Sequence, residues 1–244
     1  MIAEQLQTAL IEAKESVDRI YRQEALEYFK LLSEYVKRNE KKIQVRNRRH
    51  EAFGGYLITP QNLRTNRTYP DLYIVLAYQG QMAGIGHKST DIGTLRYIVL
   101  PVLIAPFDTK HLATRITGAK KIFVHEFIHY LDQHRYKGQV PESGAMLRKK
   151  AFGAYYNSPA EFNAFYQEGA NEVLDTVRTV QQYAEPAKPG TLASFVGNYR
   201  TFEKRFLKPP YFNKDFLDSL NQKYKKKLMQ RFYDLYQEIK KETG

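Results

Sequence analysis

Two histidines four residues apart, with a glutamate beside the first, are the residues of this sequence best suited to chemistry. They lie in the segment His125-Glu126-Phe127-Ile128-His129. On a helix, positions four apart lie one turn above each other on the same face, where two imidazoles can bind a single zinc ion. Glu126 lies beside that face and can take a proton from a zinc-bound water. The pattern therefore predicts the core of a zinc peptidase.

The residues around this motif are apolar, as expected when a buried helix carries a metal site. The helix is predicted to start at Thr117-Gly118 and to stop at Lys137-Gly138. The alternative is a helix with two hydrogen-bonded histidines and a surface glutamate, but the spacing favours zinc. The apolar flanking residues are Ile122, Phe123, Phe127, Ile128 and Leu131.

A hydrolytic zinc site needs a third protein ligand and keeps a fourth position for water. The chain has no cysteine, so the ligand must be His, Asp or Glu. His134 is one position out of register for a third histidine of the extended zinc motif, and it is not expected to be a ligand. Glu161 is the favoured candidate, because a second helix antiparallel to the first brings a carboxylate of its first turns against the metal face. Glu168 is the reserve.

The second helix is predicted to begin at Ser158-Pro159 and to run to about Tyr183, before Pro186. Serine is a good N-cap, and proline suits the first helical position. The same residues admit another role for Glu161. In a capping box, its side chain would accept a hydrogen bond from the backbone N–H of Ser158.

These residues together resemble a known family. The segment 125–132, followed by Tyr155 or Tyr156 and by the segment 160–165, is similar to the gluzincin zinc peptidases. It is closest to the catalytic domain of anthrax lethal factor and the related Pro-Pro endopeptidases. The resemblance covers roughly residues 120 to 170. It implies Zn²⁺ bound by His125, His129 and Glu161, Glu126 as the general base, Tyr155 or Tyr156 at the oxyanion, and Asp132 orienting His129.

The rest of the chain is predicted to be mostly helical around a small sheet. Apolar spacing predicts a long helix over residues 2 to about 40 that packs on the rest of the chain, with a coiled-coil dimer as the minority reading. The segment Gly84-Ile85-Gly86-His87 is interpreted as a loop. Strands are expected at Ile43–Val45, Tyr56–Ile58, Leu72–Tyr78 and Arg96–Ile104, and further helices at Thr191–Leu207 and Asn213–Glu242.

We therefore expect an α+β, mostly helical fold. A small sheet is followed by a zincin-type active-site helix and a glutamate helix, with long helices at both ends. The whole chain, 1–244, is expected to form a single zincin-like domain. Its parts are an N-terminal helical extension (1–41), a catalytic core (42–185) and a C-terminal helical region (191–244).

The net charge of +12 favours contact with an anionic partner. The charged residues are spread over the whole chain, however, and are interpreted mainly as the solvated faces of helices. The expected partner is a protein or peptide substrate. The alternative is a basic structural or nucleic-acid-binding protein that retains a peptidase-like fold. In that alternative, nucleic acid would bind to a basic cluster in the last helix, formed by Lys223, Lys225, Lys226, Lys227 and Arg231 with Tyr224.

No signal peptide is recognised, and the longest apolar run, Tyr97–Phe107, is too short to span a bilayer and is broken by Pro101 and Pro106. A cytoplasmic protein is therefore expected, and the absence of cysteine fits a reducing compartment. A virion protein, or secretion by a non-classical route, is the alternative.

Overall fold

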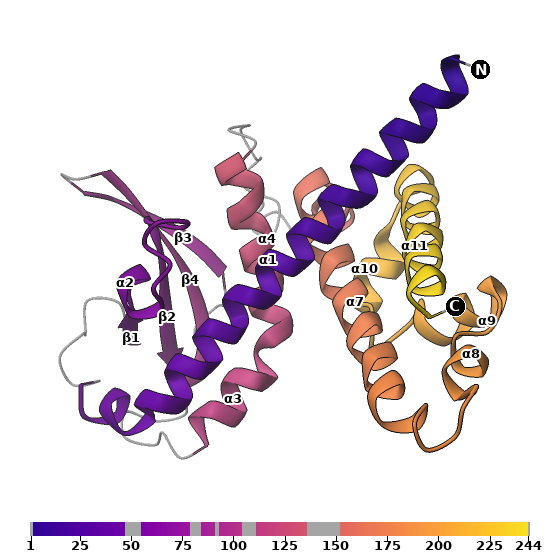
Figure 1. Ribbon diagram of the computed structural model, residues 1–244. Coiled ribbons are helices and arrows are strands. Elements are labelled where there is room, and N and C mark those ends of the chain that lie inside the picture. Colours follow the sequence, from indigo (N-terminus) through magenta and orange to yellow (C-terminus); the bar gives the residue numbers. More distant parts are fainter. Residues whose placement is uncertain are drawn as a thin grey trace. The chain divides into compact units, whose positions relative to one another are not determined.

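A computed structural model describes residues 2–46, 55–78, 84–90, 93–103, 111–135 and 152–243 (Figure 1). The predicted α+β, mostly helical fold is confirmed. The chain divides into two compact units. Unit 1 comprises Met1–Arg19 and Gly138–Gly244, and unit 2 comprises Ile20–Lys137. Within the described residues, no helix is long and apolar enough to cross a membrane.

Unit 2 contains a four-stranded sheet with the order β1-β2-β4-β3. The central strands β2 and β4 are parallel, whereas β1 and β3 pair antiparallel to them at the two edges. β2 is buried along most of its length, which is typical of a strand covered on both faces. The bounds are β1 (Gly55–Ile58), β2 (Leu72–Tyr78), β3 (Gly84–Thr90) and β4 (Gly93–Leu103), with the short helix α2 (Pro60–Leu63) after β1.

One strand prediction and one loop prediction were wrong. Ile43–Val45 belongs to helix α1 (Ile2–Arg46), because Ile43 lies seven residues after Val36 and continues its buried face. The segment Gly84–His87, expected as a loop, is part of β3 and pairs with β4. Glycine weakens an isolated strand, but here the ladder to β4 supplies the missing stability.

The first long helix packs on its own chain, as predicted. From Tyr21 onwards, the apolar face of α1 is buried in unit 2. The rings of Tyr28 and Phe29 lie 5.7 Å and 5.4 Å from that of Phe123, and Tyr28 lies 5.0 Å from Phe127. Phe123 and Phe127 are stacked at 5.4 Å on helix α4 (Lys120–Arg135). This aromatic cluster holds the helix that carries the histidine motif.

A polar network fixes the same helix to the sheet. The hydroxyl of Tyr130 donates a hydrogen bond of 2.8 Å to Oδ1 of Asp71, just before β2. Arg96 of β4 forms an ion pair with the same carboxylate, and its backbone N–H donates to the Asp71 carbonyl at 2.9 Å. Burial raises the pKa of Tyr130, so its hydroxyl stays protonated and can serve as a donor. Since Tyr130 follows His129, the network also sets the histidine face of α4.

The motif helix begins slightly later than predicted. Thr117-Gly118, taken as its start, ends the separate helix α3 (Leu112–Gly118), and α4 starts at Lys120. Lys137-Gly138, taken as its stop, lies outside the described residues.

Unit 1 is built from helices around an aromatic core. The predicted helices over 191–207 and 213–242 are each divided. Gly197 adopts a φ of 65°, and the side chain of Asn198 then caps the next helix. Asn221 caps the last helix in the same way. The bounds are α6 (Phe152–Tyr156), α7 (Pro159–Thr179), the π-helical turn η3 (Val180–Ala184), α8 (Thr191–Val196), α9 (Tyr199–Phe206), α10 (Lys214–Ser219) and α11 (Gln222–Thr243).

The core of unit 1 holds α7 against the C-terminal helices. Gly169 lies directly under the ring of Phe212, and a Cβ at this position would come within 2.4 Å of it. Only glycine allows this approach without displacing the ring. Rings of unit 1 that are almost completely buried include Phe162, Tyr166, Phe202, Phe206, Phe212, Phe216 and Phe232.

The aromatic cluster of unit 2 predicts a large loss of stability for one substitution. Phe123→Ala should lower the free energy of unfolding by about 3–5 kcal/mol, because Phe123 is 0% exposed and touches three other rings. Its neighbour Ile122 is 37% exposed, and Ile122→Ala should change stability by no more than about 0.5 kcal/mol. Urea unfolding followed by circular dichroism measures both, and equal losses would contradict the proposed packing of α4.

Candidate metal centre

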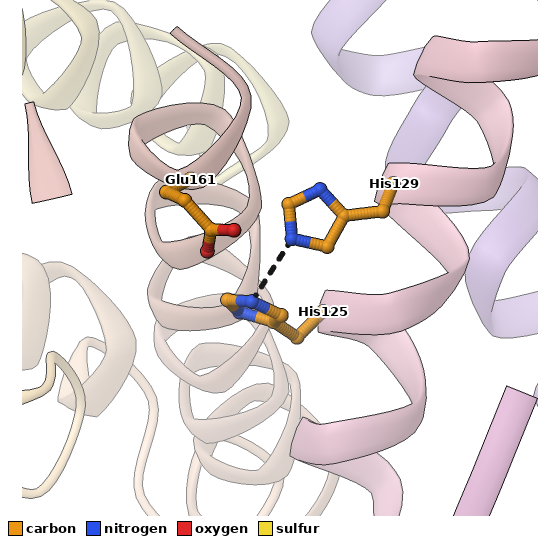
Figure 2. Close-up of side chains that lie close together, drawn as sticks. All are labelled: His125, His129 and Glu161. Carbon is orange, nitrogen blue, oxygen red and sulfur yellow. Dashed lines mark hydrogen bonds between the residues drawn. The ribbon is translucent and has the colours of Figure 1, made fainter. Parts of the chain in front are cut away.

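The two motif histidines point the same way from α4. Their Nε2 atoms lie 3.2 Å apart, and their rings meet edge to face at 4.9 Å and 77° (Figure 2). Two nitrogens that each lie 2.0–2.1 Å from one tetrahedral zinc ion would be about 3.3 Å apart. The histidine pair therefore already has the spacing of two ligands of a single ion.

Because both histidines are buried, few arrangements can satisfy the contact between their nitrogens. His125 and His129 are each only 7% exposed. A neutral imidazole has one N–H and one acceptor nitrogen, so an Nε2–Nε2 contact is satisfied either by one shared hydrogen bond or by a cation that both lone pairs bind. Two protonated imidazoles at this distance would repel each other in a medium that screens charge poorly. The pair suits a metal ion better than it suits two positive charges.

Glu161 lies in the first turn of α7 and is 1% exposed. Ser158 caps this helix, as predicted, with its Oγ accepting a hydrogen bond of 3.3 Å from the N–H of Glu161. The N–H of Ser158 donates instead to the carbonyl of Tyr155 at 3.0 Å. The Glu161 carboxylate is thus not used in the reciprocal bond of a capping box, which was the competing interpretation of this residue.

Among the described residues, His125, His129 and Glu161 form a group that could hold a metal ion. One ligand atom from each residue lies within 4.8 Å of the other two, and all three side chains are buried (Figure 2). Two imidazole nitrogens and one carboxylate oxygen are a donor set that zinc accepts, with a fourth position left for water. Glu168, the reserve candidate, is only half-buried and does not belong to this group.

The remaining predicted site residues lie on α4 and α6. Glu126 follows His125 on α4 and is half-buried. Tyr156 is buried in unit 1, with its ring 5.0 Å from Phe165, while Tyr155 is half-buried. Burial raises the pKa of Tyr156 above its ordinary value, and the nearby carboxylates of Asp215, Glu161 and Glu168 raise it further. The Tyr156 hydroxyl therefore keeps its proton at neutral pH.

Two further predictions from the sequence, which concern His134 and Asp132, stay predictions. The side chain of His134 lies outside the described residues. Asp132 is half-buried on α4, and its role in orienting His129 stays a prediction.

Sequence reasoning missed the residues that hold α4 in place. Asp71 and Arg96 lie 59 and 34 positions before Tyr130, so spacing along the chain gives no sign that the three meet. One local feature could have indicated that α4 is held by a polar contact. A tyrosine directly follows the second histidine on a helix that was otherwise predicted to be buried, and a buried tyrosine hydroxyl needs a hydrogen-bond partner.

Comparison of the chain with protein-family models, with curated proteins and with solved structures finds no match. The assignment of a function therefore depends on the residues themselves.

The geometry of the histidine pair predicts specific metal binding. The purified protein should bind about one zinc per chain, and His125→Ala and His129→Ala should each weaken zinc binding by more than about 100-fold. This exceeds the 10–100-fold cost of losing an outer partner, because a ligand itself is removed. Competition with a chromophoric chelator, together with elemental analysis, measures this loss.

His111 provides the matched control. It is exposed and adopts a φ of 64°, so His111→Asn keeps a residue type that tolerates this backbone conformation. This variant should bind zinc as the unaltered protein does. Undiminished binding by both motif variants would exclude the histidine pair as the zinc site.

Proposed function

We propose that this protein is a zinc-dependent endopeptidase of the gluzincin type. The observation that carries the proposal is the buried histidine pair, with Nε2 atoms 3.2 Å apart. Glu126 adjoins it in sequence, and Glu161 belongs to the same potential ligand group. The sequence resemblance supports the same assignment.

In the proposed hydrolysis, a zinc ion and the side chains of the protein have separate roles. A zinc ion, when bound by His125, His129 and Glu161, supplies a Lewis acid and lowers the pKa of a coordinated water to about 7. Glu126 accepts the proton of the attacking water and then delivers it to the amine that leaves. A single carboxylate can perform both transfers, because it returns to its ionised form at the end of the cycle.

A tyrosine hydroxyl is the proposed donor to the oxyanion that forms on the scissile carbonyl. Tyr156 suits this role because its raised pKa keeps the hydroxyl protonated. Tyr155 precedes it on α6, with the two rings 5.1 Å apart, and is the alternative donor.

The sheet offers a way to hold an extended substrate. β3 is an edge strand that pairs with β4 on one side. We propose that a peptide adds to its other side as a further strand, so that main-chain hydrogen bonds fix the substrate and side-chain pockets give specificity. This mode suits a protein or peptide substrate of varied sequence.

The role of Glu126 predicts a separation of metal binding from activity. Glu126→Gln should retain zinc but lower kcat for peptide hydrolysis by about 10²–10⁴-fold, since the amide cannot accept the proton of water. Digestion of a peptide library by the zinc-loaded proteins, read by mass spectrometry, first identifies a substrate and then gives the rates. A variant that keeps both its zinc and its full rate would remove Glu126 from the mechanism.

The third ligand is tested by a pair of isosteric substitutions on α7. Glu161→Gln should weaken zinc binding by more than about 100-fold, because a carboxylate ligand is removed, whereas Glu168→Gln should leave the affinity unchanged. Circular dichroism controls for helix content, and chelator competition gives the affinities. The opposite result would assign the metal to Glu168.

A further inference from the structure

A basic and aromatic groove on unit 1 lies outside the proposed catalytic residues. It has a volume of about 520 Å³ and follows one stripe of α11, with Tyr199 of α9 on its other side. Its lining residues on α11 recur at three- and four-residue spacing, so they form one continuous face of the helix. The α11 residues used below are Lys225, Lys226, Met229, Gln230 and Tyr233.

Two lysines of this groove face solvent. Lys225 and Lys226 are exposed, and within the part of the chain that the structure describes, neither makes an ion pair. Their neighbours in the basic cluster differ. Lys227 lies over the Phe162 ring at 4.8 Å, and Arg231 over the Tyr166 ring at 3.8 Å. Packing inside unit 1 therefore accounts for Lys227 and Arg231 but not for the two groove lysines.

Helix stability does not explain these lysines either. They lie in the first turns of α11, which contains no acidic residue in its first turn. The aligned peptide dipoles put partial positive charge at this end of a helix, so cations near it gain nothing from the dipole. Neither packing nor helix stability therefore requires the two lysines.

The groove also presents an aromatic surface. Tyr199 is fixed by its hydroxyl, which donates to the carbonyl of Met229 at 3.5 Å, and by its ring contact with Tyr236 at 5.6 Å. Tyr233 meets Tyr199 edge to face at 5.0 Å and 78° and is 42% exposed. A fixed tyrosine thus supports a second one whose ring is accessible to a planar ligand.

From these features we infer that the groove binds single-stranded nucleic acid, with phosphates along Lys225 and Lys226 and a base stacked on Tyr233. Lysines that follow a backbone, together with aromatic rings that stack bases, are the usual means of binding single strands without sequence preference. Two carboxylates lie towards the tyrosine end of the groove. Glu203 and Asp234 are near Tyr199, and Gln230 donates to Asp234 at 2.9 Å.

The chemistry of the lining favours this ligand over other anions. An acidic peptide or an anionic membrane surface would use the lysines but has no general need of an exposed tyrosine ring on which a base can stack. The inference does not depend on the peptidase proposal, since none of the groove residues is a proposed metal ligand or catalytic residue.

Fluorescence anisotropy of the full chain with a labelled oligothymidylate, over a range of salt concentrations, tests the inference. The double variant Lys225→Gln/Lys226→Gln should weaken binding and reduce the slope of log Kd against log salt by about 1.4, because each phosphate that a lysine no longer neutralises removes about 0.7 from the slope. Tyr233→Ala should weaken binding by about tenfold and leave that slope unchanged, because stacking releases no counterions.

The matched control is Lys240→Gln/Lys241→Gln, which removes the same charge from the other end of α11. It should leave both the affinity and the slope near those of the unaltered protein. Equal weakening in the control and groove variants would overturn the inference in favour of diffuse charge attraction. It would also be overturned by no measurable binding, or by tighter binding of polyglutamate or of phosphatidylserine vesicles than of the oligonucleotide.

Discussion

The proposed chemistry depends on two imidazole nitrogens held 3.2 Å apart in a buried place. Such a contact needs either a single shared proton or a cation that both lone pairs bind. Water is largely excluded and cannot solvate a second positive charge there. The proposed catalysis depends on the bound cation. A divalent ion satisfies both nitrogens and still needs further ligands, which Glu161 and a water molecule would provide.

The rest of unit 2 can be understood as the means of keeping this face in position. Aromatic rings of α1 and α4 pack on one another, and the Tyr130–Asp71–Arg96 network ties α4 to the two parallel strands. Apolar packing resists displacement of the helix in any direction, whereas the hydrogen bond of Tyr130 selects one rotation about its axis. A rotation of α4 would carry both histidines away from their proposed ligand positions, so the buried tyrosine supports the candidate site without being one of its proposed catalytic residues.

Sequence reasoning reached the candidate metal-binding residues because they are encoded locally. Four-residue spacing on a helix gives the histidine pair, and a serine before a proline gives the start of α7 with Glu161 in its first turn. Errors arose where local preference was overruled by distant contacts. Gly84–His87 forms a strand because β4 is there to pair with it, and Ile43 is helical because its side chain continues the buried face of α1.

The network around Tyr130 could not be predicted in the same way. Its members come from a strand, a loop before a strand and a helix, and no periodicity relates them. The breaks at Gly197 and Asn221 were missed for a simpler reason. The apolar spacing runs on through both, and the cap that ends or begins a helix is one residue in an otherwise helical pattern.

X-ray absorption at the zinc edge of the zinc-loaded, unaltered protein tests the central claim most directly. We expect four nitrogen and oxygen ligands at about 2.0–2.1 Å, with the outer-shell scattering of two imidazoles. A spectrum with no imidazole scattering, or with six oxygen ligands of a loosely bound ion, would contradict the proposed centre.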